Sequence, residues 1–159
     1  MPSDDSPNQA DVANLLAVEA IRRLKYRYAG YCDQNYAPDS LAELFTEDAV
    51  WEGGMFGIHQ GREAIRELFR GSGQTVAFAA HYMLNPIIDV SDDRGIGSWY
   101  LWQSLVMKKD SKAFWLMGKY NDDYALVDGE WKFANVKLTV DILTPYDDGP
   151  GKIRMAPFS

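Results

Sequence analysis

The chain has 159 residues, with 23 Asp and Glu against 16 Lys and Arg, for a net charge of −7. This length predicts one domain. The acidic balance disfavours nucleic acid and anionic membranes as partners, because phosphate binding depends on clustered basic residues. Cys32 is the only cysteine, which excludes an intrachain disulfide and a zinc site built on paired cysteines. We therefore expect a cytoplasmic protein.

The ends of the chain differ from its middle. Residues 1–10 are polar and lack periodicity, which is typical of an arm outside the fold, and they do not resemble a signal peptide. We expect a single domain over residues 11–145 and a C-terminal extension over residues 146–159. No apolar run approaches the ~18 residues of a membrane span.

The first part of the domain is predicted to be helical. From Asp11 to Tyr31, apolar residues recur every three or four positions, which predicts a long first helix. Start signals at residues 38–40 predict a short second helix, and a third is predicted over residues 62–70 with Gly71 as its stop. The basic residues of the first helix are expected on a solvated face; they are Arg22, Arg23, Lys25 and Arg27.

Beyond Gln74 the pattern predicts strands. β-Branched and aromatic residues alternate with short turn clusters, which indicates strands over residues 79–90, 95–108, 112–127 and 130–143, with a shorter one over 48–52. Pro86 cannot donate to a strand ladder, so we expect a bulge or an edge there that curves the sheet. Helices followed by hairpin-linked strands predict an α+β fold with the helices packed on one face.

Several kinds of site are disfavoured. Gly95-Ile96-Gly97 opens a strand and lacks the third glycine of a dinucleotide fingerprint, and the glycines at 71 and 73 are predicted to form a turn. No serine stands in a G-x-S-x-G elbow. His59 and His81 are the only histidines, and His59 is predicted in a loop, so we predict neither a metal nor another cofactor.

His81 and Asp33 form the candidate reactive pair. His81 begins a predicted strand in apolar company, where a buried imidazole needs a partner that fixes its tautomer. Asp33 lies near the predicted C-terminus of the first helix, where the macrodipole disfavours a carboxylate by about 0.3–1 kcal/mol. A histidine beside it compensates for this cost, whereas the alternative is a solvated aspartate in a turn. Tyr28 precedes Asp33 by five positions and faces the same cavity if the helix presents a broad face; the alternative is a plain core tyrosine.

Several short motifs follow one another in the order found in a known superfamily. They are Ile21-x2-Leu24-x3-Tyr28-x4-Asp33, Leu44-Phe45-Thr46-Glu47-Asp48-Ala49, Gly61-Arg62-Glu63-Ala64-Ile65, His81-x3-Asn85-Pro86-x-Ile88 and Asp122-Asp123-Tyr124-x3-Asp128-Gly129-x-Trp131. Over residues 14–145 the chain resembles the nuclear transport factor 2-like superfamily, and within it the SnoaL-like group. The resemblance implies three helices on a strongly curved antiparallel or mixed sheet that forms a cone-shaped barrel with a central cavity.

The resemblance also implies a chemistry. Bile-acid dehydratases pair a tyrosine and an aspartate five residues apart with a strand histidine, a pattern that Tyr28, Asp33 and His81 match, and hexachlorocyclohexane dehydrochlorinase has Lys, Asp and His in these places. Ketosteroid isomerases resemble the chain at Tyr28, but their general base falls on Gly53, which disfavours that reaction. These lyases carry an arginine on the last strand, where this chain has Val136 to Val140 with only Lys137 basic.

We therefore expect a cofactor-free lyase, a dehydratase or dehydrohalogenase, in which His81 is the general base, Asp33 orients it and Tyr28 donates a hydrogen bond. The 13% aromatic content favours an apolar cavity for a small alicyclic, steroid-like or polyketide-like substrate. Its walls are predicted to be Trp51, Phe56, Trp99, Trp102, Trp115 and Leu138. The alternatives are a noncatalytic binding or assembly module and the small subunit of a ring-hydroxylating oxygenase.

The same aromatic surplus favours association. An open curved sheet with this many aromatic residues leaves larger apolar patches than monomers usually expose. We expect a homo-oligomer, a trimer in preference to a dimer. The C-terminal extension resembles the segment that the dehydrochlorinase contributes to subunit contacts.

Overall fold

The computed structural model describes residues 8–157. The arm predicted over residues 1–10 lies outside this range up to Pro7, and Phe158 and Ser159 of the predicted extension also lie outside it. The first helix, α1 (Gln9–Asp33), begins two residues earlier than predicted because Asn8 and Asp11 form a reciprocal capping box. The Asn8 side chain accepts from the Asp11 amide at 3.0 Å, and the Asp11 carboxylate accepts from the Asn8 amide at 3.3 Å.

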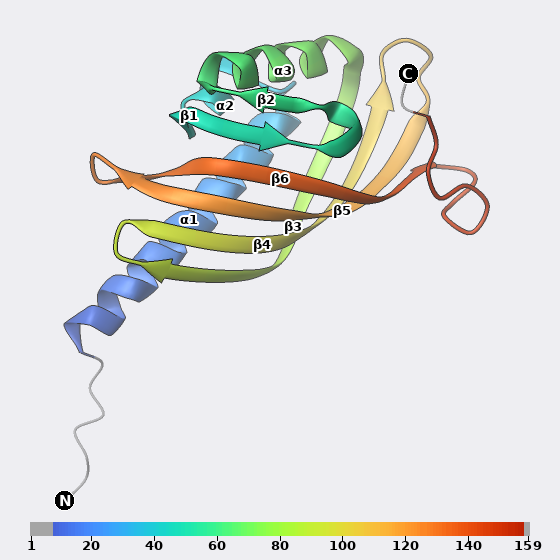
Figure 1. Cartoon of the computed structure of the whole chain (residues 1–159). Helices are drawn as coiled ribbons and strands as arrows, with labels where there is room; N and C mark the ends of the chain where they lie inside the picture. The colour runs from blue at the N-terminus through green and yellow to red at the C-terminus, as the bar shows by residue number, and fades with distance from the viewer. Residues whose placement is uncertain (1–7, 158–159) are drawn as a thin grey trace, which may run out of the picture.

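A six-stranded mixed sheet, two of whose strands precede the third helix in the chain, curves around the helices (Figure 1). Its strands are β1 (Phe45–Glu52), β2 (Ile58–Gln60), β3 (Val76–Ser91), β4 (Arg94–Met107), β5 (Ala113–Val127) and β6 (Glu130–Pro145), in the spatial order β2-β1-β6-β5-β4-β3. Only β1 and β6 run parallel. The remaining elements are α2 (Pro38–Ala42), α3 (Arg62–Thr75) and the 3₁₀ turn η1 (Gly54–Phe56).

The α+β fold with helices on one side of the sheet is confirmed, but the barrel is not closed, because β2 and β3 remain the two edges. Pairing between β3 and β4 shifts register between Leu84 and Ile87, and Asn85 takes a φ of 50°. The bulge predicted at Pro86 is thus confirmed. His59 was expected in a loop, yet it lies in β2, opposite Trp51.

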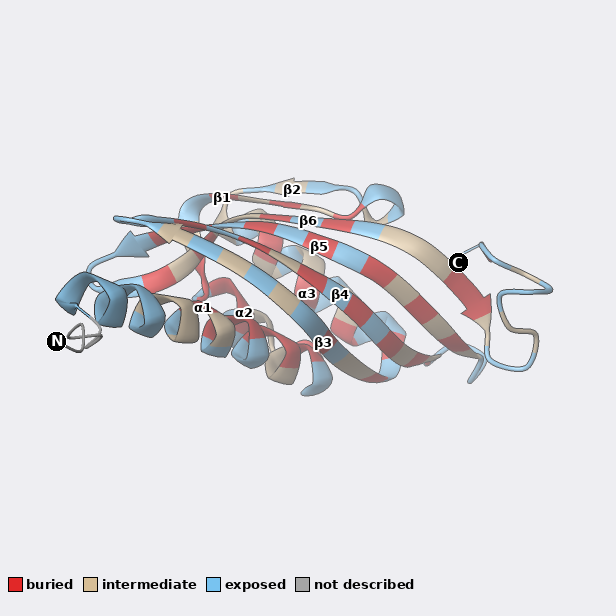
Figure 2. Cartoon of the chain, turned by 90° about the horizontal axis from the view of Figure 1, so that it is seen from below, coloured by how far each residue is buried: buried red, intermediate tan, exposed pale blue. Residues whose placement is uncertain are grey.

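Burial alternates along the long strands (Figure 2). In β4 the inward positions are Trp99, Leu101, Gln103 and Leu105, and the residues between them face outward. The inward side chains meet the buried face of α1, which includes Ile21, Leu24 and Tyr28, in one core cluster. This core sits between the helices and the sheet, so any cavity in it has walls from both.

Two predictions about the helices are wrong. The third helix does not stop at Gly71 but continues to Thr75, so residues 71–73 are helical and not a turn. Lys25 does not lie on a solvated face: its side chain is completely buried and its ammonium lies 2.7 Å from the Asp122 carboxylate of β5. The other three basic residues of that group face outward or lie at the margin of the buried face.

Position 73 of α3 needs a glycine because the chain at Asn35 passes too close for a side chain. A Cβ at Gly73 meets the Asn35 carbonyl oxygen at 2.6 Å, whereas a Cβ at Gly71 meets nothing within 4 Å. We expect Gly73→Ala to destabilise the protein by about 1–3 kcal/mol through overpacking, despite the helix propensity gained. Gly71→Ala is the matched control and should stabilise by about 0.5–1 kcal/mol. Urea unfolding measures both, and equal effects at the two positions would contradict the close approach.

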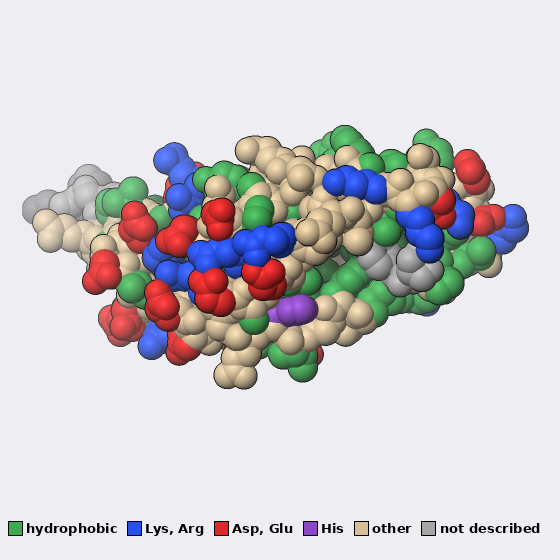
Figure 3. All heavy atoms as spheres, turned by 90° about the horizontal axis from the view of Figure 1, so that it is seen from above, with side chains coloured by type: hydrophobic (Ala, Val, Ile, Leu, Met, Phe, Trp, Pro, Cys, Tyr) green, Lys and Arg blue, Asp and Glu red, His purple; other side chains and the backbone are tan. Residues whose placement is uncertain are grey.

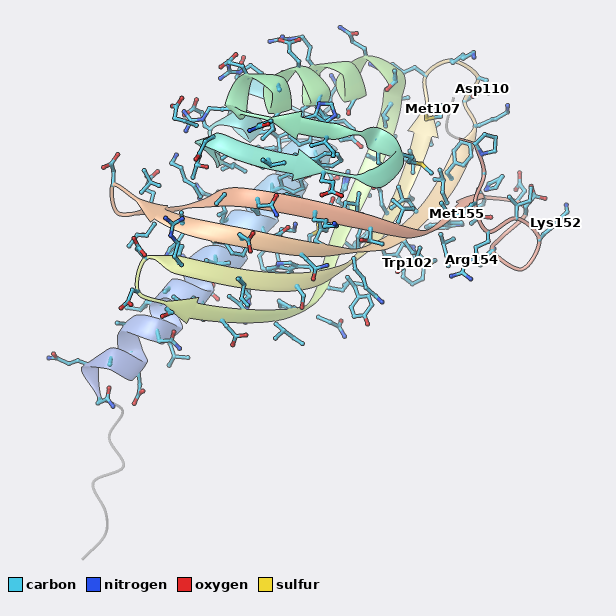
Figure 4. The ribbon with its side chains drawn as sticks, in the orientation of Figure 1. Trp102, Met107, Asp110, Lys152, Arg154 and Met155 are labelled. Atoms are coloured by element: carbon cyan, nitrogen blue, oxygen red, sulfur yellow. The ribbon has the colours of Figure 1, made fainter. Side chains whose placement is uncertain are left out.

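The C-terminal tail folds back on β6. The Leu143 amide donates to the Arg154 carbonyl at 2.9 Å and the Ala156 amide donates to the Leu143 carbonyl at 2.7 Å, so Met155 and Leu143 form a parallel bridge. Figure 4 shows Met155 and Arg154 at the same end of the sheet as Trp102. The tail is therefore anchored along the edge of β6, beyond the residues that pair with β1.

Charges of both signs alternate over the face seen in Figure 3, which looks down on α3. Arg62, Arg66 and Arg70 of this helix each pair with an acidic side chain, so this face is not a basic patch. Within residues 8–157, no helix is long and apolar enough to cross a membrane.

Candidate functional site

A cavity lies between the helices and the inner face of the sheet. Its volume is about 80 Å³, or about 590 Å³ when the part open to solvent is included, so its enclosed part is smaller than a typical small-molecule site. Its walls are mostly apolar and aromatic, with a few polar groups. The lining residues are Tyr28, Cys32, Tyr36, Trp51, Phe56, Leu68, Phe69, Ser72, Thr75, Val76, His81, Gln103, Leu105, Leu116, Tyr120 and Leu138.

Asp33 and His81 form a hydrogen-bonded pair at this wall. Asp33 Oδ1 lies 2.7 Å from His81 Nδ1 and also accepts from the His81 backbone amide at 2.9 Å. The double contact fixes the carboxylate against both the ring and the backbone of β3. The contact predicted from the sequence is therefore present; the catalytic role of the pair stays a prediction.

The two members of the pair differ in exposure. The His81 side chain is 5% exposed and the Asp33 side chain 37%, because Asp33 is the last residue of α1 and also lines a groove on the outer side of the wall. With Nδ1 held by the carboxylate, Nε2 is the ring nitrogen left free to meet a ligand. This is the arrangement in which a carboxylate sets the tautomer of a histidine base.

Tyr28 lines the same cavity from α1. Its ring is buried, and its hydroxyl oxygen accepts a hydrogen bond from Trp51 Nε1 at 3.1 Å. Burial raises the pKa of Tyr28 well above its ordinary value, and the neighbouring Tyr120 raises it further. The phenol is therefore neutral at physiological pH and able to donate a proton in a hydrogen bond.

The structure divides the predicted cavity walls into two groups. Trp51, Phe56 and Leu138 line the cavity, whereas Trp99, Trp102 and Trp115 do not. Trp99 is buried away from it, where its Nε1 donates to the Tyr124 hydroxyl at 3.0 Å. Trp102 is 46% exposed on the outer face of the sheet, and Trp115 packs edge-on against it with ring centroids 6.0 Å apart. These three assignments are wrong: alternation puts Trp102 and Trp115 on the outer face, whereas Trp99 faces inward but lies farther along β4, beside Tyr124 and outside the cavity.

Six lining residues with a polar group or a thiol were not predicted from the sequence: Cys32, Tyr36, Ser72, Thr75, Gln103 and Tyr120. Gln103 left a usable signal, because it is a polar residue at an inward position of an otherwise apolar alternation in β4. Tyr36 left none, since it follows α1 in a left-handed backbone conformation that sequence periodicity does not reveal. Lys137 does not line the cavity. Its ammonium lies 3.2 Å from the Glu52 carboxylate.

None of the described residues form a cluster of three or more His, Cys, Asp or Glu side chains suited to a metal ion. The polar groups of the cavity-lining residues are phenols, an imidazole, a carboxamide, a thiol, two aliphatic hydroxyls and an indole N–H. Groups of these kinds exchange protons and hydrogen bonds with a ligand.

Cys32 gives a pH dependence that can be measured. Burial raises the pKa of its thiol, Asp33 raises it further, and Lys25 opposes both. The unfolded thiol ionises above about pH 8.5 whereas the folded thiol stays protonated, so stability is present below this pH and is lost as pH rises. We expect the free energy of unfolding to fall by up to about 1.4 kcal/mol per pH unit above it.

Urea unfolding of the wild type and of Cys32→Ala between about pH 8 and pH 9.5 isolates this effect. The upper limit stays below the ionisation of unfolded tyrosines, four of which are also buried in the fold. The alkaline loss of stability should be smaller in Cys32→Ala, whatever the substitution does at neutral pH. Parallel slopes in the two proteins would contradict the assignment.

Comparisons with known proteins agree with this fold and cavity. The model of the SnoaL-like domain matches residues 13–137. A solved structure from Novosphingobium aromaticivorans that carries the provisional name scytalone dehydratase is 29% identical, with a TM-score of 0.77 over 83% of this chain and 89% of its own. Another from the same organism, provisionally named an aromatic ring hydroxylase, is 26% identical, with a TM-score of 0.74 over 81% and 92%.

Hexachlorocyclohexane dehydrochlorinase LinA-type3 from Novosphingobium barchaimii is 22% identical, with a TM-score of 0.76 over 90% of this chain and 96% of its own, and this likeness concerns the fold alone. No curated protein matches. The family model covers most of the chain, and the structure has the helices, mixed sheet and cavity expected of it. The chain belongs to the SnoaL-like domain family.

Proposed function

We propose that the protein is a lyase that eliminates a leaving group from a small hydrophobic alicyclic, steroid-like or polyketide-like compound without a cofactor. His81 Nε2 removes a proton from a carbon next to an electron-withdrawing group. The C–H electron pair becomes the new double bond, and the leaving group departs with its own bonding pair. Asp33 orients the imidazole and stabilises its cation, and Tyr28 donates a hydrogen bond to a substrate oxygen.

The observation that carries this proposal is the 2.7 Å contact between Asp33 and His81 at the wall of an aromatic cavity. A protein that only binds a ligand has no need to hold a carboxylate against a buried imidazole, because the pair brings no packing advantage over apolar side chains. The provisional name of the 29% identical structure, a dehydratase, supports the same class of reaction.

The test is a panel of cyclic ketones that carry a leaving group two carbons from the carbonyl. 3-Hydroxycyclohexanone, 3-chlorocyclohexanone and fused bicyclic analogues all give conjugated enones, whose ultraviolet absorption reports elimination. Enzyme-dependent formation of an enone that is lost in His81→Ala supports the proposal. Saturable binding of the panel without elimination would favour the noncatalytic binding module instead.

We also propose that the protein is a homo-oligomer, with a trimer expected. The outer face of β3 and β4 exposes Phe78, Tyr82, Tyr100 and Trp102, which we call the outer aromatic patch. Trp115 and Tyr146 extend it, with their rings stacked at 5.2 Å. Contiguous exposed aromatic groups of this kind mark association surfaces.

We expect light scattering to give about three times the chain mass of 18.0 kDa. Trp102→Glu should dissociate the assembly, because it places a charge within the apolar contact. Leu16→Glu changes an exposed leucine of α1 and serves as the control. A wild-type mass of one chain at micromolar concentration would refute the assembly.

A further inference from the structure

Tyr36 and Gln103 lie side by side in the cavity, next to His81. Gln103 is the cross-strand partner of His81 in the β3–β4 ladder, so both side chains project from the same face of the sheet. The Tyr36 and His81 rings meet edge-on, with centroids 5.7 Å apart. The cavity therefore has a second pair of polar side chains beside the proposed base.

The backbone at Tyr36 is strained. Asn35 and Tyr36 have φ values of 57° and 52°, and a bulky residue in this left-handed region costs of the order of 1 kcal/mol. The Tyr36 amide donates to the Cys32 carbonyl at 3.0 Å, which holds the turn, and its ring stacks on Phe69 at 6.4 Å. Strain of this kind persists where the position of a side chain matters to function.

The hydrogen bond between the two residues sets what each can offer a ligand. Gln103 Nε2 donates to the Tyr36 hydroxyl oxygen at 3.3 Å. Burial raises the pKa of Tyr36, so the phenol keeps its proton and can donate it. The side-chain carbonyl oxygen of Gln103 takes no part in this bond and can accept a hydrogen bond from a ligand. One donor and one acceptor together match a hydroxyl group, which both accepts and donates.

The absence of basic side chains from the described cavity lining favours a hydroxyl as the leaving group. None of the described lining residues is Lys or Arg, so no permanent cation is positioned to stabilise a departing halide. A hydroxyl needs instead a donor to its oxygen and a proton before it leaves as water. Tyr36 supplies the donor, and the nearby imidazole holds the proton taken from carbon.

We propose that Tyr36 and Gln103 form the subsite for the leaving hydroxyl, so that the substrates are β-hydroxy carbonyl compounds and not halides. The hydroxyl donates to the Gln103 carbonyl and accepts from Tyr36. When its C–O bond breaks, it takes the bonding pair and the proton that His81 removed, and departs as water. The assignment of this hydroxyl as leaving group rests on the proposed lyase function, whereas its binding by the subsite does not.

The binding test uses a matched pair of probes in the His81→Ala protein, which cannot turn them over by the proposed route. 3-Hydroxycyclohexanone and 3-methylcyclohexanone have nearly the same shape, and their affinities are measured by quenching of tryptophan fluorescence, with Trp51 in the cavity wall. We expect the hydroxyl compound to bind about tenfold tighter. Adding Tyr36→Phe or Gln103→Leu should bring the ratio close to one, while Thr139→Val, at an exposed position of β6, should leave it unchanged.

The rate test uses otherwise unmodified protein. Tyr36→Phe and Gln103→Leu should slow elimination from 3-hydroxycyclohexanone at least tenfold more than elimination from 3-chlorocyclohexanone. A ratio near one in His81→Ala itself, or a ratio that survives both substitutions, would overturn the subsite. If the binding ratio falls as expected but no elimination occurs with any probe, the subsite stands and the lyase function fails. Equal slowing of both eliminations would overturn the assignment of the leaving group.

Discussion

Replacing His81 with alanine is expected to lower the rate of elimination by roughly 10²–10⁴-fold, the range for a positioned general base. Its Nδ1 is occupied by Asp33 at 2.7 Å, and its ring is almost completely buried at the cavity wall. No other imidazole of the described residues lines the cavity, so nothing of similar basicity replaces it. The measurement is enone formation from the most reactive ketone of the panel.

Asp33→Asn is expected to cost nearly as much. An amide can donate to Nδ1 and so favour the tautomer in which Nε2 carries the proton and is no longer a base. Tyr28→Phe should cost less, because water can partly replace a donated hydrogen bond. Asp89→Asn and Tyr82→Phe change exposed residues of β3 in the same chemical way and serve as controls.

The fold of each variant is checked by its unfolding midpoint, so that a loss of rate is not a loss of structure. Retention of full activity in His81→Ala, with the fold intact, would remove the pair from the mechanism. If Asp33→Asn were inactive but Tyr82→Phe and Asp89→Asn were also slow, the effect would belong to the packing of β3 and not to the chemistry of the site.

The Asp33–His81 contact could be predicted because each residue carried a local reason for it. A carboxylate at the end of a helix and a histidine at the start of an apolar strand each need a partner, and both lie within elements that periodicity predicts. The placement of Tyr36 could not be predicted in this way. It depends on two successive left-handed residues and on the close approach of α3 at Gly73, which are properties of the packed chain.

Two of the three misplaced tryptophans, Trp102 and Trp115, show what strand alternation decides. Trp99 and Trp102 are three positions apart on β4, so a regular strand must send their side chains to opposite faces. Trp115 lies opposite Ser104 in the ladder and so shares the outer face with Trp102. The composition shows a surplus of aromatic residues but not where they lie. Trp102 belongs to the outer aromatic patch and Trp115 to its extension, and neither lines the cavity.

Lys25 illustrates the same limit on a helix. It stands four residues after Ile21 and three before Tyr28, both of which are buried, so helical periodicity places it on the inner face. Its positive charge led to the prediction of a solvent-exposed position, because its partner Asp122 is 97 residues away in sequence. A rule based on residue type therefore favoured the wrong face, while the periodicity alone was informative.

Lys25→Met is expected to destabilise the protein by about 3–5 kcal/mol, the cost of removing one partner from a buried ion pair. Both side chains are fully buried, and the Lys25 ammonium also lies 3.4 Å from the centre of the Tyr120 ring. Asp122 would keep only the Tyr124 hydroxyl, which donates to its Oδ2 at 2.9 Å, while its Oδ1 already has no hydrogen-bond partner. An unpaired buried carboxylate is thus left behind.

The double variant Lys25→Met/Asp122→Asn separates the pair from its surroundings. Asparagine can still accept from Tyr124, and no charge is left, so the double variant should recover at least about 1–2 kcal/mol relative to Lys25→Met. Arg23→Met removes a partner from an exposed i,i+4 pair with Glu19 and should change stability by no more than about 0.5 kcal/mol. Losses of similar size from Lys25→Met and Arg23→Met would show that the buried pair has no special role.

The pH dependence of the Lys25→Met variant identifies the cause of its loss. Burial raises the pKa of the Asp122 carboxyl, and Lys25 opposes this increase; without the lysine the folded pKa rises further. A carboxyl whose folded pKa exceeds its unfolded value of about 3.9 favours folding below that value, and this advantage is lost as pH rises through the folded pKa. The deficit of Lys25→Met relative to wild type should therefore be largest near pH 7 and shrink towards pH 4, as measured by urea unfolding at both values. A deficit that does not change with pH would assign the loss to missing contacts of the lysine side chain and not to the stranded carboxylate.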